Sequence, residues 1–262
     1  ADHPEALASL QGLAAVVQAQ GKLGEAEALA RRALQGRERR LGPEHPLTLA
    51  SVGALAGILE AQGRLGEAEP LCRRALWGNE AVLGGGHPGT LASVGSLALL
   101  LQAQGKLDEA ELLYRRALQG HELHEEGEGG EPSNRGGTAR DPDMAACLHN
   151  YAGLLQAQGH LAEAAHMYTR ALPGKGTSFG CDHPSTFMNI MSAARLFQAE
   201  GEFGKAEPLL RRAFRGLEKS LGKDHPSSLM ALHHLASVLL AQGKLDDAGP
   251  LSSRVLQKQQ AM

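Results

Sequence analysis

The chain has 262 residues, of which 42% are hydrophobic and only 3% aromatic, so its core must be built mainly from Leu, Ala and Val. The net charge of −3 excludes the basic field that attracts nucleic acids or anionic membranes, and we expect neither as a partner. No run approaches the roughly 18 apolar residues that cross a bilayer, and we see no signal-peptide pattern.

One motif recurs six times along the chain. It reads Gly, a charged residue or His, Leu or Phe, any residue, Glu, Lys or Asp, and Ala, and it starts at Gly21, Gly63, Gly105, Gly159, Gly201 and Gly243. Successive starts are 42, 42, 54, 42 and 42 residues apart. A fixed period of this length indicates an array of one supersecondary unit, not an ordinary globular domain.

Each repeat is predicted to contain two helices separated by the glycine of the motif. We count positions within a repeat from Leu7, Leu49, Leu91, Ala145, Phe187 and Leu229. Apolar residues at positions 1, 4, 8 and 11 share one face of a first helix, and small or apolar residues at positions 17, 20, 24, 27 and 28 mark a second. Ala at positions 8 and 20 lets the two helices approach closely. The 33 glycines should weaken any helix that contains them.

The connectors between repeats read Leu-Gly-x-x-His-Pro, as in residues 41–46 and 221–226. Gly suits the residue after a helix end, and Pro suits the first turn of the next helix. The histidines of these connectors are interpreted as capping or packing residues: His3, His45, His87, His183 and His225.

Three segments make up the predicted organisation. Residues 1–120 form repeats one to three, residues 121–141 form a flexible Gly/Glu-rich insertion, and residues 142–262 form repeats four to six of one continuous solenoid. The insertion lengthens one spacing by 12 residues and has too few apolar side chains to bury. We interpret it as a tolerated loop, with a binding or modification site as the alternative.

Small or apolar residues at positions 4, 7, 8, 11, 20, 24 and 27 resemble the tetratricopeptide repeat. The 42-residue period, with segments such as 63–76 followed by 84–88, is similar to the kinesin-light-chain class of these repeats. The resemblance implies an all-α, right-handed α-solenoid of six helix-turn-helix repeats. It also implies a partner peptide in a concave groove lined by the first helices. Of the Asn side chains that this class often carries at positions 5 and 6, Asn150 alone is present.

The candidate binding residues are polar side chains at concave positions 5, 6, 9 and 12, chiefly in repeats four to six. They are His149, Asn150, Gln156, Arg195, Gln198, His233, His234 and, in repeat one, Gln11. Together they could bind the backbone and an acidic residue of a partner, with Arg195 as the charge anchor. The alternative is a solvated inner face without a ligand. In repeats one to three the same positions are mostly small, which could admit a partner helix.

Several other patterns are interpreted as structural. Arg recurs at position 26 of every repeat, where we expect a solvated side chain paired with Glu of the same or a neighbouring hairpin. Adjacent helical residues such as His233 and His234 point about 100° apart and cannot chelate one metal ion together. Cys72, Cys147 and Cys181 form no CxxC pair, which indicates a reducing, cytoplasmic setting.

No phosphate-binding loop, nucleophile motif or metal-ligand motif is present, so we expect no enzyme activity, cofactor, metal or small-molecule substrate. The sequence therefore predicts a protein–protein interaction scaffold or adaptor that holds a peptide or helix of a partner. One alternative is a regulatory or sensor domain of a larger protein. Another is a structural array that self-associates through its end hairpins.

Overall fold

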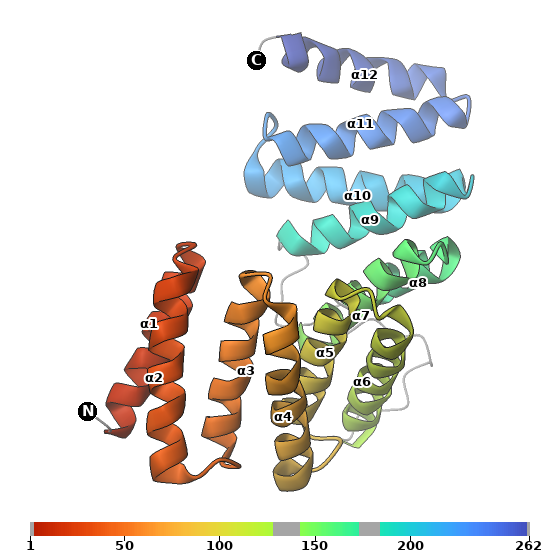
Figure 1. The fold of residues 1–262 in the computed structure, drawn as a ribbon. Coiled ribbons are helices and arrows are strands. Elements are labelled where there is room, and N and C mark those ends of the chain that lie inside the picture. The colour runs from red at the N-terminus through yellow and green to blue at the C-terminus, as the bar shows by residue number, and fades with distance from the viewer. Residues whose placement is uncertain (1–2, 128–141, 173–183, 261–262) are drawn as a thin grey trace. The chain divides into compact units, whose positions relative to one another are not determined.

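The computed structural model describes residues 3–127, 142–172 and 184–260, which form helices joined by short connections (Figure 1). The first helices of the six repeats are α1 (Pro4–Ala19), α3 (Pro46–Ala61), α5 (Pro88–Ala103), α7 (Pro142–Ala157), α9 (Pro184–Ala199) and α11 (Pro226–Ala241). The second helices are α2 (Leu23–Leu41), α4 (Leu65–Leu83), α6 (Leu107–Gly127), α8 (Leu161–Arg170), α10 (Phe203–Leu221) and α12 (Leu245–Gln260). No strand occurs in these ranges, and the predicted all-α repeat solenoid is confirmed.

The helices form two compact units, Ala1–Glu131 and Pro132–Met262, with three helix pairs in each. Within a unit every helix packs on its neighbours in sequence, and first helices of adjacent repeats also touch, α3 with α5 and α9 with α11. The first helices therefore form the inner layer of each stack. Residues 121–127 belong to α6, and the rest of the predicted insertion lies outside the described residues.

The connector histidines cap the helices that follow them. Nδ1 of His45 accepts a hydrogen bond from Leu47 N at 3.2 Å, and Nδ1 of His87 accepts one from Gly89 N at 3.0 Å. His225 makes the same bond with Ser227 N at 3.2 Å. These side chains satisfy one of the backbone donors that a helix N-terminus leaves unpaired, which confirms the predicted capping role at three sites. His3 makes no such bond, and His183 lies outside the described residues.

The motif glycine sits in the tight turn between the two helices of a repeat. All six have φ between 76° and 86°, a left-handed conformation that side chains with a Cβ rarely adopt. This backbone requirement explains why Gly recurs at this point of every repeat.

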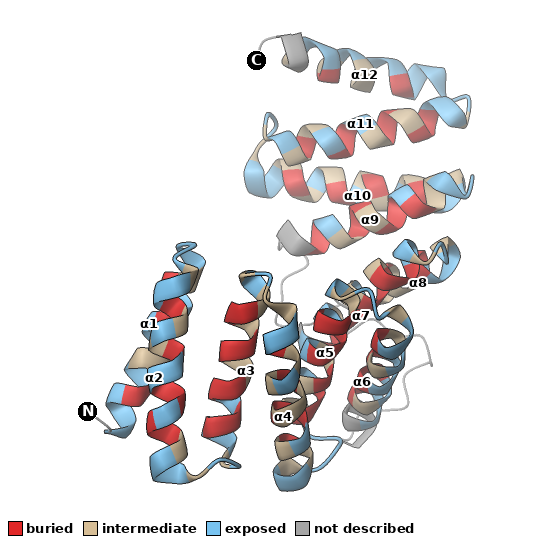
Figure 2. Ribbon diagram, in the orientation of Figure 1, coloured by how far each residue is buried: buried red, intermediate tan, exposed pale blue. Residues whose placement is uncertain are grey.

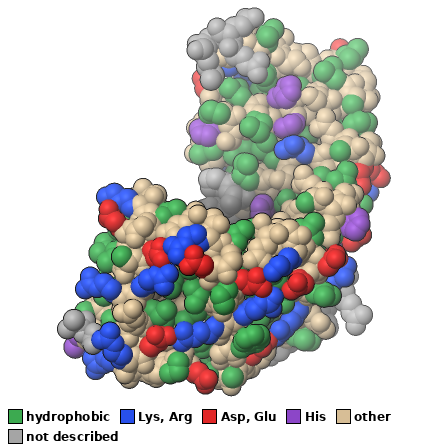
Figure 3. Space-filling model, in the orientation of Figure 1, with side chains coloured by type: hydrophobic (Ala, Val, Ile, Leu, Met, Phe, Trp, Pro, Cys, Tyr) green, Lys and Arg blue, Asp and Glu red, His purple; other side chains and the backbone are tan. Residues whose placement is uncertain are grey.

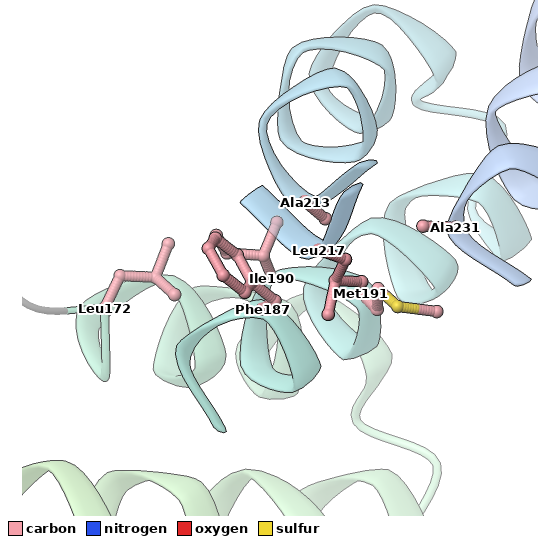
Figure 4. Close-up of a cluster of buried hydrophobic side chains, with 7 residues drawn as sticks. All are labelled: Leu172, Phe187, Ile190, Met191, Ala213, Leu217 and Ala231. Atoms are coloured by element: carbon pink, nitrogen blue, oxygen red, sulfur yellow. The ribbon is translucent and has the colours of Figure 1, made fainter. Parts of the chain in front are cut away.

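Alanine and leucine build the core along facing helix surfaces (Figure 2). The six Ala at position 20 are fully buried, and the six at position 8 are at most 3% exposed. In the second unit Phe187 and Ile190 of α9 lie with Ala213 and Leu217 of α10 in one buried cluster (Figure 4). The small residues let the helix backbones approach, and the larger ones fill the space between repeats.

Glycine at position 30, inside the second helix, has a packing role. A Cβ at Gly78 would lie 2.5 Å from a methyl carbon of Leu49, and Gly36, Gly120 and Gly216 are crowded in the same way by Leu7, Leu91 and Phe187. In each case the neighbour is the residue at position 1 of the same repeat. The expectation that glycine only weakens these helices is therefore wrong at position 30, because the side chain at position 1 occupies the space of the missing Cβ.

Charged side chains connect the second helices of adjacent repeats. Arg at position 26 pairs with Glu at position 32 of the preceding repeat: Arg74 with Glu38 at 2.7 Å, Arg116 with Glu80, and Arg254 with Glu218 at 3.1 Å. These pairs confirm the predicted role of the recurring Arg at three of its six positions. We call this series the Arg–Glu ladder.

A second series of ion pairs joins Glu at position 21 to the cation at position 16 of the next repeat. The pairs are Glu27 with Arg64 at 2.8 Å, Glu69 with Lys106 at 2.9 Å and Glu207 with Lys244 at 2.6 Å. Hydrogen bonds from Lys106 and Arg73 lower the pKa of Glu69 to about 2. The registry of the stack is thus specified by charge as well as by packing.

Candidate functional site

Arg195 on α9 is the cation among the predicted binding residues of the second unit. It is exposed and forms no ion pair with another described residue. Its charge acts on His234 of α11 and on Tyr168 of α8. Arg195 therefore lies within electrostatic reach of side chains from two neighbouring helices, as expected for a residue at the middle of a shared surface.

The two adjacent histidines of α11 differ in environment. His233 is exposed, whereas His234 is half-buried, and their ring centroids lie 5.8 Å apart with an interplanar angle of 59°. Burial lowers the pKa of His234, and the positive charges of Arg195 and His233 lower it further. His234 therefore favours its neutral form more than a free imidazole does, and the neutral ring can donate one hydrogen bond and accept another.

His149 of α7 is fixed by contacts with two helices. Its Nδ1 lies 2.6 Å from Oδ1 of Asn189 on α9, so that the ring nitrogen donates to the amide oxygen. The ring also meets Tyr168 of α8 edge to face, with centroids 5.3 Å apart. This side chain both joins repeats four and five and exposes part of its ring.

Three predicted amides keep free side chains. Gln156 is exposed, Asn150 and Gln198 are half-buried, and none of the three side chains forms a hydrogen bond with another described residue. Each amide therefore retains donors and acceptors that an extended peptide backbone can use. With His149, Arg195, His233 and His234 they make up what we call the Arg195 surface.

Figure 3 shows histidines and a basic side chain on one visible face of the second unit, with acidic side chains at its edge. The Arg195 surface is drawn from the first helices α7, α9 and α11, which form the inner layer of this unit. An exposed guanidinium without a carboxylate partner favours an anionic group on whatever binds there.

Gln11 belongs to the first unit and is not part of the Arg195 surface. Its Oε1 accepts a hydrogen bond from Oγ of Ser51 at 3.1 Å, and Nη1 of Arg37 donates to the same hydroxyl at 2.7 Å. Arg37 and Ser51 are both buried. Gln11 therefore has a structural role between repeats one and two in addition to the predicted partner contact.

Sequence reasoning missed Tyr168 and Asn189, which hold His149 in place. Tyr168 is 5% exposed, and its burial raises the pKa of the phenol while Arg195 opposes that shift. Residue spacing could have revealed the contact between His149 and Asn189. Asn189 follows His149 by 40 residues, and Ser51 follows its partner Gln11 by the same distance in sequence. A polar pair repeated at this spacing links position 5 of one repeat to position 3 of the next.

In the first unit the inner layer has a hollow of about 360 Å³ in place of a polar surface. Small residues line it, among them Ala50, Gly53, Ala92 and Ser96 of α3 and α5. Asn79 of α4 also faces it and donates a hydrogen bond to Oγ of Ser93 at 2.8 Å. The hollow is thus lined by α3, α4 and α5 of repeats two and three, and a groove along all of repeats one to three stays a prediction.

The described residues also bear on metal binding, membrane spanning and thiol chemistry. No cluster of three or more His, Cys, Asp or Glu in these ranges is arranged to hold a metal ion. Of the described helices, none combines the length and apolar character of a membrane span. Cys72 and Cys147 are buried thiols outside any disulfide, and burial raises their pKa values to about 11 and about 12.

Comparison with known families gives one consistent match. A family model described as tetratricopeptide repeat matches residues 5–76, 51–122 and 178–258, and a second model of that description matches residues 144–185. No curated protein matches this chain in sequence.

Solved structures give the same architecture. The chain is similar to a solved structure from Podosopora anserina, described as kinesin light chain nearly identical TPR-like repeats. The two sequences are 28% identical, and the TM-score is 0.65 over 82% of this chain and 97% of that one. BtubC (BKLC) from P. vanneervenii has 24% identity and a TM-score of 0.66 over 83% and 81% of the two chains. PilF of Pseudomonas aeruginosa has 15% identity and a TM-score of 0.64 over 97% and 91%. The last two likenesses concern the fold alone.

Proposed function

This chain belongs to the tetratricopeptide repeat family, and we propose that it is a non-catalytic scaffold or adaptor that holds a peptide or helix of a partner protein on the Arg195 surface. The observation that carries the proposal is the exposed guanidinium of Arg195, without a carboxylate partner among the described residues. Its positive charge also acts on the half-buried imidazole of His234.

The chemistry of the Arg195 surface suits an extended peptide with an acidic side chain. Arg195 supplies a planar, permanently charged donor for a carboxylate. Asn150 and Gln198 supply amides that can pair with the peptide backbone without regard to its side chains. Charge would set the position of the peptide, and the amides would hold its backbone.

In a repeat array the stacked inner helices form an extended, continuous surface, and such arrays use this surface to bind partners. The hollow lined by α3, α4 and α5 in the first unit offers a second place where a partner helix could approach closely. A protein or peptide is therefore the partner class we propose, in place of a nucleic acid, membrane or small-molecule substrate. A cytoplasmic location remains a prediction, which rests on the absence of a CxxC pair in the sequence.

The test is affinity capture of proteins from lysate by the wild-type chain and by an Asn150→Ala, Arg195→Ala, His233→Ala triple variant. We expect the variant to lose specific captured proteins, because it lacks the charge anchor and two polar contacts. The matched control is an Arg32→Ala, Gln35→Ala double variant on α2, whose side chains are exposed. An identical protein set from the wild type and the triple variant would overturn the proposed surface.

A second candidate is self-association through the end hairpins. Leu13 and Val16 on α1 are 48% and 55% exposed, and Leu245 and Leu256 on α12 are 65% and 56% exposed. Exposed apolar side chains on terminal repeats are the expected contacts of such an assembly. Sedimentation over a wide concentration range tests self-association, since a chain that stays monomeric at all concentrations excludes this function.

A third candidate is a regulatory role within a larger protein. The coding sequence on either side of this chain would test it, by showing whether a catalytic domain is encoded there.

A further inference from the structure

At the step from repeat four to repeat five, the sequence has no Glu for the Arg–Glu ladder. Arg212 of α10 occupies position 26, the position at which Arg74, Arg116 and Arg254 bind Glu of the preceding repeat. The corresponding position 32 of repeat four is Gly176 in the sequence. Arg212 is exposed and has no ion pair with a described residue.

Further cations lie on the same side of α10. Residues 208, 212, 215 and 219 are spaced by three or four and share one face of the helix, and Arg211 lies next to Arg212. This spacing places Arg211, Arg212, Arg215 and Lys219 together. Arg211 is bound to Glu207 at 2.9 Å and approaches Asp247 at 3.4 Å. Arg215, like Arg212, is exposed and has no ion pair with a described residue. Among the residues that the structure describes, no carboxylate is therefore paired with either of these two guanidinium groups.

These cations surround a hollow of about 480 Å³, which we call the α10 hollow. Phe187 and Pro208 contribute its apolar part, and the four cations contribute its charged part. Phe187 packs against Gly216 and is only 2% exposed, so its ring forms part of a rigid floor (Figure 4). The volume suits one or two side chains of a bound peptide, not a whole helix.

We propose that the α10 hollow binds the carboxylates of an acidic peptide segment of a partner protein. At three other steps of the ladder a Glu carboxylate fills the equivalent place, so the Arg at position 26 is already presented for carboxylate binding. Arg212 and Arg215 together can take two carboxylates, or one carboxylate in a bidentate fashion.

A nucleic acid is a poorer occupant on the same evidence. The aromatic ring at the hollow is buried, so it offers no exposed face on which a base could stack. The α10 hollow uses the second helix of repeat five, whereas the Arg195 surface uses first helices, so the two proposals stand independently.

The test is fluorescence anisotropy with a labelled hexaglutamate peptide, titrated with the whole chain at low and at high salt. We expect binding that weakens at high salt, and no binding of a labelled hexaglutamine peptide. Arg212→Ala, Arg215→Ala should weaken hexaglutamate binding by about tenfold or more, because two charge-assisted contacts are lost. Arg212→Lys, Arg215→Lys should retain part of the affinity, since the charge remains.

Two controls make the result specific to the α10 hollow. Arg32→Ala removes an exposed Arg from the same position of repeat one and should leave the affinity unchanged. Arg195→Ala removes one guanidinium of the Arg195 surface and should lower the affinity for hexaglutamate less than Arg212→Ala, Arg215→Ala does, which separates the α10 hollow from the proposed function. Equal affinities of the wild type and the Arg212→Ala, Arg215→Ala variant would overturn the proposal. So would loss of binding in Arg195→Ala alone, or preferential binding of a phosphopeptide or oligothymidine at these residues.

Discussion

Phe187 at the start of α9 occupies the space that a Cβ on Gly216 of α10 would fill. The same relationship joins Leu49 to Gly78, so the glycine at position 30 and the large residue at position 1 form one packing unit within a repeat. Because Phe187 is buried and its ring is rigid, it has little freedom to move aside.

We therefore expect Gly216→Ala to destabilise the second unit by about 1–3 kcal/mol, as overpacking does in a filled core. The matched control is Gly57→Ala in α3, where a new Cβ meets no atom within 4 Å. That change should stabilise by about 0.5–1 kcal/mol, because Ala restricts the unfolded chain more than Gly does. The midpoints of urea unfolding measure both effects. A Gly216→Ala variant as stable as the wild type would contradict the packing argument.

Glu69 should make stability depend on pH in the acid range. Its pKa is lowered to about 2 in the folded state, from an ordinary value of 4.5, first by Lys106 and then by Arg73 and Gln104. A lowered folded pKa means that the carboxylate stabilises the fold above about pH 4.5, and that this contribution is lost as the pH falls towards 2. Because Lys106 is 42% exposed, solvent screens the pair and we expect on the order of 1 kcal/mol.

The corresponding experiment compares urea unfolding of the wild type and Glu69→Gln between pH 3 and pH 7. The variant should be less stable at pH 7, and the difference should shrink as the pH approaches 3. Glu25→Gln is the control, because Glu25 is exposed and has no ion pair with a described residue. A difference that is constant across this pH range would show that Glu69 does not act through its charge.

The connector histidines should be replaceable by another acceptor. His87→Ala removes the bond from Gly89 N and should cost about 1 kcal/mol, the usual effect of losing an N-cap. His87→Asn keeps an acceptor at the cap and should recover most of that loss. Thermal unfolding of the two variants is the measurement, and equal losses would show that the ring packs and does not cap.

The sequence was sufficient to predict the helix pairs, their glycine turns and the buried Ala, because these follow from periodicity and local backbone preferences. The paired Arg at position 26 was also predictable, since Glu recurs in the neighbouring repeat. The packing of Phe187 on Gly216 was not, because it depends on the separation of two helix backbones. Likewise, the hydrogen bond between His149 and Asn189 joins different positions of adjacent repeats. To predict it, one must know by what angle each repeat is rotated relative to the next, which the sequence does not state.

The buried cysteines should be unreactive in the folded protein. Burial raises the pKa of Cys72 to about 11 and that of Cys147 to about 12, so both are thiols and not thiolates at pH 8. In a Cys181→Ser variant, which leaves only these two cysteines, a thiol reagent such as dithionitrobenzoate should react slowly until urea unfolds the chain. The amount of thionitrobenzoate released then reports two thiols per chain. Fast reaction of both thiols without urea would mean that the repeats open readily and that neither side chain is protected by the core.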